Sequence, residues 1–173
     1  MFRDLEYERL IIINIILLAL WTLVCFLACI IIKESYFNPD KPMYKMKKWE
    51  KSGKWYVKNL KIKAWKDILP QHIGRNGFSK EHFTDSSIDY IDKFIMETCR
   101  GEWDHSMNCL YAIIAILINP FWIGILFAFI TLLINLPFIA IQRYNRFRLL
   151  TVRKRVSRLN QNNDVLKTRI EEA

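Results

Sequence analysis

The sequence is poor in the residues that build the common catalytic and metal centres of soluble proteins. Its 173 residues include five glycines, four cysteines and three histidines. The glycines form no Gly-rich phosphate loop and no G-x-S-x-G turn that would expose a nucleophilic serine. The cysteines lack C-x-x-C spacing and have no pair of histidines nearby, which argues against a zinc site or a disulfide framework. We therefore expect neither a metal nor a cofactor.

Apolar side chains and positive charge are both abundant, and they occupy different parts of the chain. Hydrophobic residues make up 52% of the sequence, and the formal net charge is +9. The run 10–32 contains 23 residues, enough for a helix to cross a hydrocarbon core of about 30 Å. It has no strongly basic leader before it and no convincing cleavage site after it. The sequence therefore predicts an all-α integral membrane protein that begins with a retained transmembrane helix.

A second apolar run, 107–141, is too long for one membrane span and short for two. Asn119-Pro120 divides it near the middle, so we predict helices over 104–118 and 121–141 joined by a tight turn. This pair forms either a complete transmembrane hairpin or a shallower re-entrant one. Within the second helix we expect Pro137 to introduce a kink, and Asn135 either to contact another helix or to line a site.

The segment 33–103 is hydrophilic and basic, and in its first half Trp and Tyr alternate closely with Lys. This mixture is typical of the membrane–water interface, where rings lie among headgroups and ammonium groups reach phosphates. We expect contacts with anionic lipid headgroups there. Similar mixtures occur in proteins that bind single-stranded nucleic acid, but the flanking apolar runs favour a membrane surface, and no nucleic-acid partner is expected. Residues 60–64 alternate as in a strand, and their local structure stays open.

Charge predicts the orientation in the membrane. Both 33–103 and the tail 142–173 are rich in Lys and Arg, and the positive-inside rule assigns both to the cytoplasm. An even number of crossings must then separate them, and the N-terminus lies outside in a multi-pass arrangement. Apolar residues repeat every seven positions from Val152 to Ile170. This tail is either a helix on the membrane surface or a short coiled coil that joins a homodimer.

The most informative local pattern lies between these segments. Ser86 is a candidate helix cap, and Ile91, Ile95 and Thr98 then recur at helical spacing. Glu102 and His105 continue the same stripe, one turn apart, near the predicted membrane surface. One interpretation is a general base, His105, that Glu102 orients and whose cationic form Glu102 stabilises. The alternative is a structural ion pair or a polar cap that reaches from a membrane helix to the surface.

Several blocks in order give the chain a family resemblance that extends from about Trp49 to Arg148. They are Trp65-Lys66-Asp67 with Leu69-Pro70, Gly77-Phe78-Ser79-Lys80, Glu97-Thr98 with Arg100, Glu102 with His105, Asn135 with Pro137, and Gln142-Arg143-Tyr144-Asn145-Arg146 with Arg148. The chain resembles the glycosyl-diaponeurosporenoate acyltransferase family of bacterial membrane proteins. Gly101 and Ser106 stand where the family pattern has alanine and tryptophan.

The resemblance implies transfer of a fatty acyl chain to a sugar hydroxyl of a membrane glycolipid in the bacterial cell membrane, with a glycosyl carotenoid ester as one such acceptor. The acyl donor would be acyl-CoA or an acyl carrier protein. His105 would deprotonate the hydroxyl, with Glu102 as its partner. The implied substrate-binding residues are Arg143, Asn145, Arg146, Glu97, Arg100, Lys66, Asp67 and Asn135.

Two other classes of function stay open at this level. A non-enzymatic membrane scaffold for a glycolipid pathway would need the helices but neither Glu102 nor His105. A lipid hydrolase would use the same base with water as the acceptor. For the arginines after 141, ordinary positive-inside anchoring is the alternative to a binding role.

Overall fold

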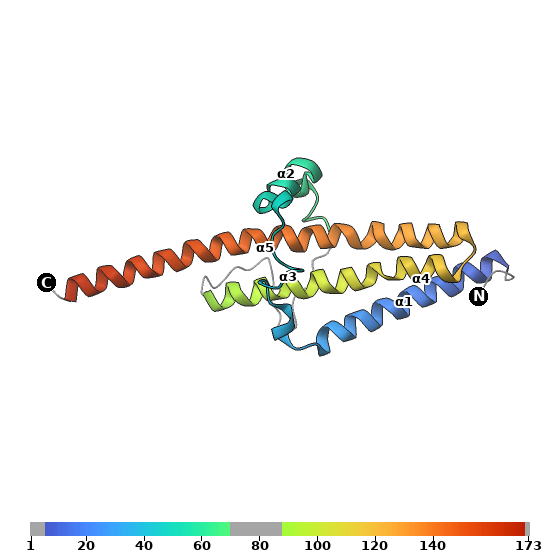
Figure 1. Cartoon of the computed structure of the whole chain (residues 1–173), viewed down its shortest axis with the longest axis horizontal. Coiled ribbons are helices and arrows are strands. Elements are labelled where there is room, and N and C mark those ends of the chain that lie inside the picture. The colour runs from blue at the N-terminus through green and yellow to red at the C-terminus, as the bar shows by residue number, and fades with distance from the viewer. Residues whose placement is uncertain (1–5, 70–87, 172–173) are drawn as a thin grey trace. The chain divides into compact units, whose positions relative to one another are not determined.

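A computed structural model of the chain describes residues 6–69 and 88–171, in which every regular element is helical. The α-helices are α1 (Tyr7–Ile31), α2 (Lys54–Leu60), α3 (Ile88–Cys109), α4 (Tyr111–Ile118) and α5 (Phe121–Glu171), and three short 3-10 segments are η1 (Glu34–Phe37), η2 (Lys48–Gly53) and η3 (Ile62–Ala64) (Figure 1). The all-helical class predicted from the sequence is confirmed. The strand-like stretch 60–64 forms the end of α2 and η3. The predicted cap Ser86 and the block at Gly77 lie outside the described residues.

Two helices are long and apolar enough to cross a membrane: α1, with 25 residues, and the part of α5 from Phe121 to Asn162. Only 17% of the apolar window of α1 is buried, so its large side chains are mostly exposed, among them Ile12, Ile15 and Val24. A helix in the core of a soluble protein would cover such side chains. The exposed apolar surface of α1 instead suits lipid.

The second apolar run differs from the prediction in two ways. Its first helix is interrupted at Leu110, where the backbone N–H of Leu110 bonds to the carbonyl of Met107 and that of Ile113 to the carbonyl of Leu110. These bonds close shorter rings than those of an α-helix, and they separate α3 from α4. Its second helix does not end at 141, because no glycine or proline follows Pro137 before the end of α5. The predicted tail is therefore continuous with the second apolar helix.

The described chain divides into two compact units, and α3 and α5 each contribute to both. Unit 1 comprises Met1–Phe37 and Arg100–Gln142. Its apolar core is formed by Tyr111, Ala115 and Phe127, with side chains of α1 packed against them. In Figure 1, α4 and the first part of α5 lie side by side in opposite directions, joined by the turn at Asn119-Pro120.

A pair of buried amides joins α1 to this turn. Asn14 donates to the side-chain oxygen of Asn119 at 2.7 Å, and Asn119 donates back to that of Asn14 at 2.8 Å. The spare N–H of each amide bonds to a backbone carbonyl of its own helix, and Tyr111 donates to the carbonyl of Asn14. Because every polar group of the pair has a partner, the pair is suited to an apolar environment. Asn14 is thus a residue that packs α1 against this turn.

Gly124 permits the close approach of α5 to α4. A Cβ at this position would lie 2.9 Å from Ile116 Cα and 3.0 Å from the carbonyl oxygen of Ala115, and these backbone atoms cannot yield without moving a helix. We expect Gly124→Ala to destabilise unit 1 by about 1–3 kcal/mol. Gly101→Ala is the control, because the Cβ would meet only the flexible end of Gln142 and alanine favours helix. Unfolding of both variants in a mild detergent checks this: equal stability would contradict the close packing.

Unit 2 comprises Asn38–Cys99 and Arg143–Ala173. Ile91 and Ile95 of α3 are buried with Leu149 of α5, and Val156 packs against them. Part of the apolar repeat in the tail is therefore used within the chain. Leu159 and Ile170, further along α5, are exposed, and the homodimer stays a prediction.

Candidate functional site

His105 is held in unit 1 by a hydrogen bond to α5. Its Nδ1 lies 3.0 Å from Oδ1 of Asn135. The amide of Asn135 is itself oriented, because its Nδ2 donates to the carbonyl of Thr131 at 2.9 Å. An amide oxygen can only accept, so Nδ1 of His105 carries the proton and the lone pair of the neutral ring lies on Nε2. This is the tautomer in which Nε2 can take a proton from a substrate.

The plane of the imidazole ring is also fixed. Phe138, on the same helix as Asn135, stacks on His105 with ring centroids 4.7 Å apart and an interplanar angle of 10°. One hydrogen bond and one stacked ring leave the imidazole little rotational freedom. A side chain that must accept a proton in one direction benefits from such restraint, since less order has to be imposed during the reaction.

Glu102 and Asp104 place two carboxyl groups close to His105 in sequence. Glu102 lies on the buried stripe of α3 and is 8% exposed. At Nδ1 the partner of His105 is Asn135 rather than Glu102, so the orienting role predicted for Glu102 falls at that atom to Asn135. Asp104 interacts electrostatically with His105, and within the described ranges its buried Oδ1 has no hydrogen-bond partner. No pattern in the sequence singles out Asp104.

Arg100 lies two residues before Glu102 on α3, and residues Glu34 and Phe37, just after α1, hold it. Its Nη2 is 3.9 Å from the Glu34 carboxylate, and its guanidinium lies 5.1 Å from the ring centroid of Phe37. Phe37 in turn packs edge-on against Trp103 at 6.2 Å. η1 and α3 thus form one set of contacts, in which the Arg100 side chain is mostly buried. Its predicted part in substrate binding stays a prediction.

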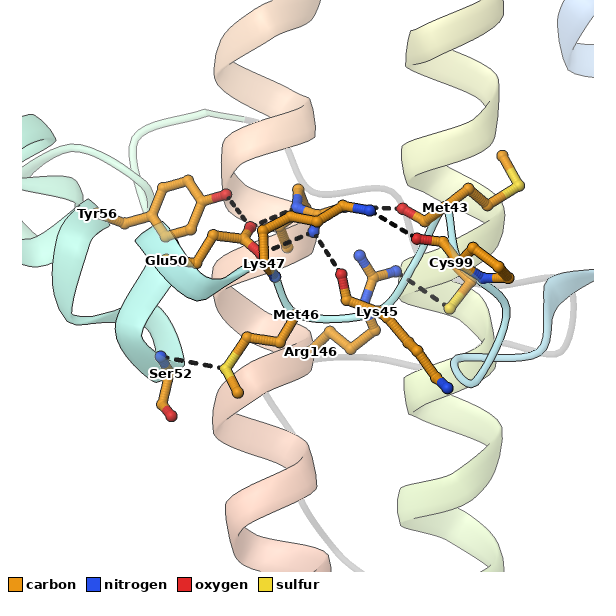
Figure 2. A network of polar contacts seen from close by, with 11 residues as sticks. Met43, Lys45, Met46, Lys47, Glu50, Ser52, Tyr56, Cys99 and Arg146 are labelled. Atoms are coloured by element: carbon orange, nitrogen blue, oxygen red, sulfur yellow. Dashed lines mark hydrogen bonds and ion pairs between the residues drawn. The ribbon is translucent and has the colours of Figure 1, made fainter.

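In unit 2 the dominant feature is a fully buried carboxylate, Glu50 (Figure 2). Arg143 binds it through two bonds, Nε to Oε1 at 2.6 Å and Nη2 to Oε2 at 2.8 Å. The Tyr56 hydroxyl donates to Oε1 at 2.6 Å, and the backbone N–H of Lys47 donates to Oε2 at 2.5 Å. Each carboxylate oxygen therefore accepts two hydrogen bonds, which is what a buried charge requires.

Arg143 also binds the segment that precedes Glu50. Its Nη1 donates to the carbonyl of Met43 at 3.1 Å, and its Nη2 donates to that of Lys45 at 3.0 Å. With the two bonds to Glu50, four of its N–H groups are occupied within the chain. The geometry therefore favours Arg143 as the residue that fixes this segment to α5. Its predicted contact with substrate remains a prediction.

The ionisation of this pair follows from its contacts. Burial opposes the charge on Glu50, but the hydrogen bonds from Arg143, Tyr56 and the Lys47 backbone outweigh it and lower the pKa of the carboxyl group. Burial and the neighbouring Glu50 carboxylate both raise the pKa of Tyr56. Glu50 is therefore ionised and Tyr56 is protonated at neutral pH, so Tyr56 acts as a hydrogen-bond donor.

A left-handed turn brings α2 against α5. Lys51, Ser52 and Gly53 all have positive φ, at 48°, 56° and 85°. At Gly53 a Cβ would lie 3.3 Å from Tyr144 and 3.6 Å from Phe147, so a larger residue would meet aromatic rings as well as an unfavourable backbone conformation. The turn thus depends on glycine and positions Tyr56 to reach Glu50.

Arg146 is wholly buried one turn further along α5. Its Nη1 donates to Sγ of Cys99 at 3.1 Å (Figure 2). Its guanidinium lies 5.4 Å from the ring centroid of Tyr44. Neither Arg143 nor Arg146 is a surface anchor of the positive-inside kind. That interpretation fits Arg148, which is exposed and lies over the ring of Tyr144.

The remaining candidates are more accessible. Asn145 and Glu97 are half-buried in unit 2, and Lys66 forms an ion pair with its exposed neighbour Asp67. Across the described ranges, no group of three or more His, Cys, Asp or Glu is placed to hold a metal ion.

Besides Asp104, three residues that contribute to these contacts were not predicted from the sequence. Glu50 is the only acidic residue between Lys41 and Lys66, and that isolation was a usable signal. Tyr56 and Phe138 gave none, because an aromatic residue in a Lys-rich or apolar segment is ordinary. Their roles depend on partners on other helices.

The candidate residues of unit 1 and those of unit 2 lie within the same stretch of sequence that matches a known protein family. The sequence model of a family described as glycosyl-4,4'-diaponeurosporenoate acyltransferase matches residues 39–155. The enzyme of that name from Staphylococcus aureus strain MRSA252 is 33% identical over 135 residues, which cover 77% of this chain and 81% of the relative. Those of strains bovine RF122 / ET3-1 and USA300 are 32% and 31% identical over the same shares. No solved structure matches the chain.

Proposed function

The chain belongs to the glycosyl-4,4'-diaponeurosporenoate acyltransferase family, and on that premise we propose that it transfers a fatty acyl chain to a sugar hydroxyl of a membrane glycolipid. The names of the relatives indicate a glycosyl carotenoid ester as the acceptor. The observation that carries the chemical part of the proposal is the oriented imidazole of His105, with Nδ1 bonded to Asn135.

The reaction needs one proton to move twice. Nε2 of His105 takes the proton from the sugar hydroxyl as its oxygen attacks the carbonyl carbon of an acyl thioester. The tetrahedral intermediate then collapses, the carbon–sulfur bond breaks, and the imidazolium returns the proton to the leaving thiol. The products are the sugar ester and a free thiol, with acyl-CoA or an acyl carrier protein as the donor. Asn135 keeps the proton on Nδ1 throughout.

Glu102 supplies negative charge beside the imidazolium that forms in the first step. Its side chain is on α3, one turn before His105. A carboxylate at this position stabilises the positive ring more than the neutral one. The proposal therefore retains Glu102 as a charge partner and assigns the hydrogen bond that orients the ring to Asn135.

The proposed setting is the bacterial cell membrane, with α1 and the apolar part of α5 in lipid. The exposed apolar side chains of both helices support this. The basic segments 33–103 and 142–173 are proposed to face the cytoplasm and the N-terminus to lie outside, because of the positive-inside rule. Donor and headgroup contacts by Lys66, Asp67, Glu97, Asn145 and Arg146 rest on the family resemblance.

Lipid profiling of cells tests the proposal. Cells with the gene deleted are complemented with wild type, with His105→Ala or with Ser106→Ala, and membrane levels of each protein are measured. We expect one acylated glycolipid to disappear in the deletion and with His105→Ala, and to return with wild type and Ser106→Ala. Ser106 is a neighbour whose hydroxyl donates to the backbone carbonyl of Glu102.

Other outcomes identify the competing functions. If His105→Ala restores the lipid as well as wild type does, the base is wrong and a scaffold role is favoured. If an acylated lipid accumulates on deletion, the chain removes acyl groups and is a hydrolase.

A further inference from the structure

The segment 45–63 exposes an unusual excess of positive charge. Eight lysines in it are exposed: Lys45, Lys47, Lys48, Lys51, Lys54, Lys58, Lys61 and Lys63. The only acidic residue in this segment is Glu50, and Glu50 is buried and bound by Arg143. None of the eight forms an ion pair within the part of the chain that the structure describes. We call residues 45–63 the lysine segment.

Apolar side chains are exposed between these lysines. Trp49 is 50% exposed and packs edge-on against Trp55, with ring centroids 4.9 Å apart. Met46 is 52% exposed, and Val57 and Leu60 are also exposed. A surface made only to stay soluble would not combine these side chains. Ammonium groups beside tryptophan and aliphatic side chains match the boundary between phosphate headgroups and acyl chains.

The lysine segment is also held in one conformation. Tyr56 and the backbone of Lys47 both bond to Glu50, which Arg143 fixes to α5. Lys51 and Ser52 both have positive φ. This backbone conformation is unfavourable for residues other than glycine and persists only where the surrounding structure fixes it. Little conformational freedom would therefore be lost when the segment binds a partner.

We propose that the lysine segment docks on anionic phospholipid headgroups of the membrane in which the chain is anchored. It begins fourteen residues after the end of α1 at Ile31, so a connection of at most about 50 Å tethers it to the end of a membrane helix. An acidic carrier protein would satisfy the charges, but it would leave Trp49 and Met46 without an apolar environment. The inference rests on the membrane location proposed above and does not depend on His105.

Hydrogen exchange of the full chain in lipid nanodiscs tests the docking. The chain is incorporated into discs of phosphatidylcholine alone or with 30% phosphatidylglycerol, and amide exchange is followed over 43–64. We expect slower exchange of this segment in the anionic discs, and loss of the difference in high salt. Each lysine near an anionic surface contributes about fivefold to binding, so Lys51→Gln/Lys54→Gln/Lys58→Gln should weaken docking on the order of 100-fold and remove the protection.

The matched control removes the same charge elsewhere. Lys154→Gln/Arg155→Gln/Arg158→Gln changes three exposed basic residues of α5 and should leave the lipid-dependent protection intact. Equal loss in both triple variants would mean that net charge alone attracts the lipid, and would overturn the proposal. So would identical exchange in the two kinds of disc, or protection that arises only when an acidic carrier protein is added. Incorporation of the chain into discs tests the proposed membrane location independently of the docking. An acyl-transfer assay in the neutral discs tests the proposed base, His105, independently of both.

Discussion

Asn135→Leu is expected to lower kcat for acyl transfer by about 100-fold or more, because an unoriented imidazole loses most of the benefit of general-base catalysis. Without the amide oxygen, nothing in the hydrogen-bond pattern keeps the proton on Nδ1 of His105. The ring would then divide between two tautomers and more than one orientation. The measurement is the rate of acyl transfer by the purified protein reconstituted in lipid.

The double variant makes this prediction specific. If Asn135 acts through His105, then His105→Ala/Asn135→Leu should be no slower than His105→Ala alone, because the two residues form one functional unit. Independent effects that multiply would show that Asn135 acts elsewhere, for example on the substrate directly.

Asn108→Leu is the matched control for removal of a buried amide. Asn108 is 3% exposed on α3, and its Oδ1 has no hydrogen-bond partner among the residues that the structure describes. Its replacement should leave kcat within a few-fold of wild type. A loss as large as that of Asn135→Leu would mean that any disturbance of unit 1 stops the reaction, and the specific role of Asn135 would fail.

The sequence predicted the helices well where one physical signal was strong. A 23-residue apolar run at 10–32 can hardly form anything but a long helix, and α1 covers Tyr7–Ile31. The stripe through Ile91, Ile95, Thr98 and Glu102 is buried, as its spacing predicts. The interruption at Leu110 was not predictable, because no glycine or proline marks it and the change involves only which carbonyl accepts each bond.

The candidate site was predictable in part for a similar reason. Helical periodicity places Glu102 and His105 on the buried face of α3, but it cannot identify the side chain that faces them from another helix. Asn135 is 30 residues from His105 in sequence, and Glu50 is 93 residues from Arg143. The polar residues of each pair can be seen in the sequence. Only the folded chain shows that they lie close together.

The largest stability effect is expected at the pair of Glu50 and Arg143. Arg143→Met leaves a buried carboxylate without its cation, and such losses cost about 3–5 kcal/mol. Amide exchange over 43–56 should then become about 150- to 4,000-fold faster, since each 1.4 kcal/mol or so corresponds to a factor of ten. Glu50→Gln/Arg143→Met should recover part of this loss, because it removes both charges together.

An exposed ion pair provides the control for charge removal. Arg153 bonds to Asp92 in the same unit, and both side chains are more than 40% exposed. Arg153→Met should therefore change stability by at most about 1 kcal/mol. If Arg143→Met had an equally small effect, the segment 43–56 would not depend on Arg143, and Arg143 would be free for the substrate contact that the family resemblance implies.

The same pair should make the segment 43–56 sensitive to acid. The pKa of Glu50 is lowered in the folded chain, so its contribution is complete above the ordinary carboxyl pKa and is lost as the pH falls through the lowered value. We expect exchange over 43–56, corrected for the intrinsic effect of pH, to be constant near neutrality and to accelerate below about pH 4.5. In Glu50→Gln/Arg143→Met this acceleration should be absent. If the acceleration persisted in the double variant, the acid sensitivity would belong to another carboxyl group. The effect of Arg143 on the segment 43–56 would then need a cause other than the charge of Glu50.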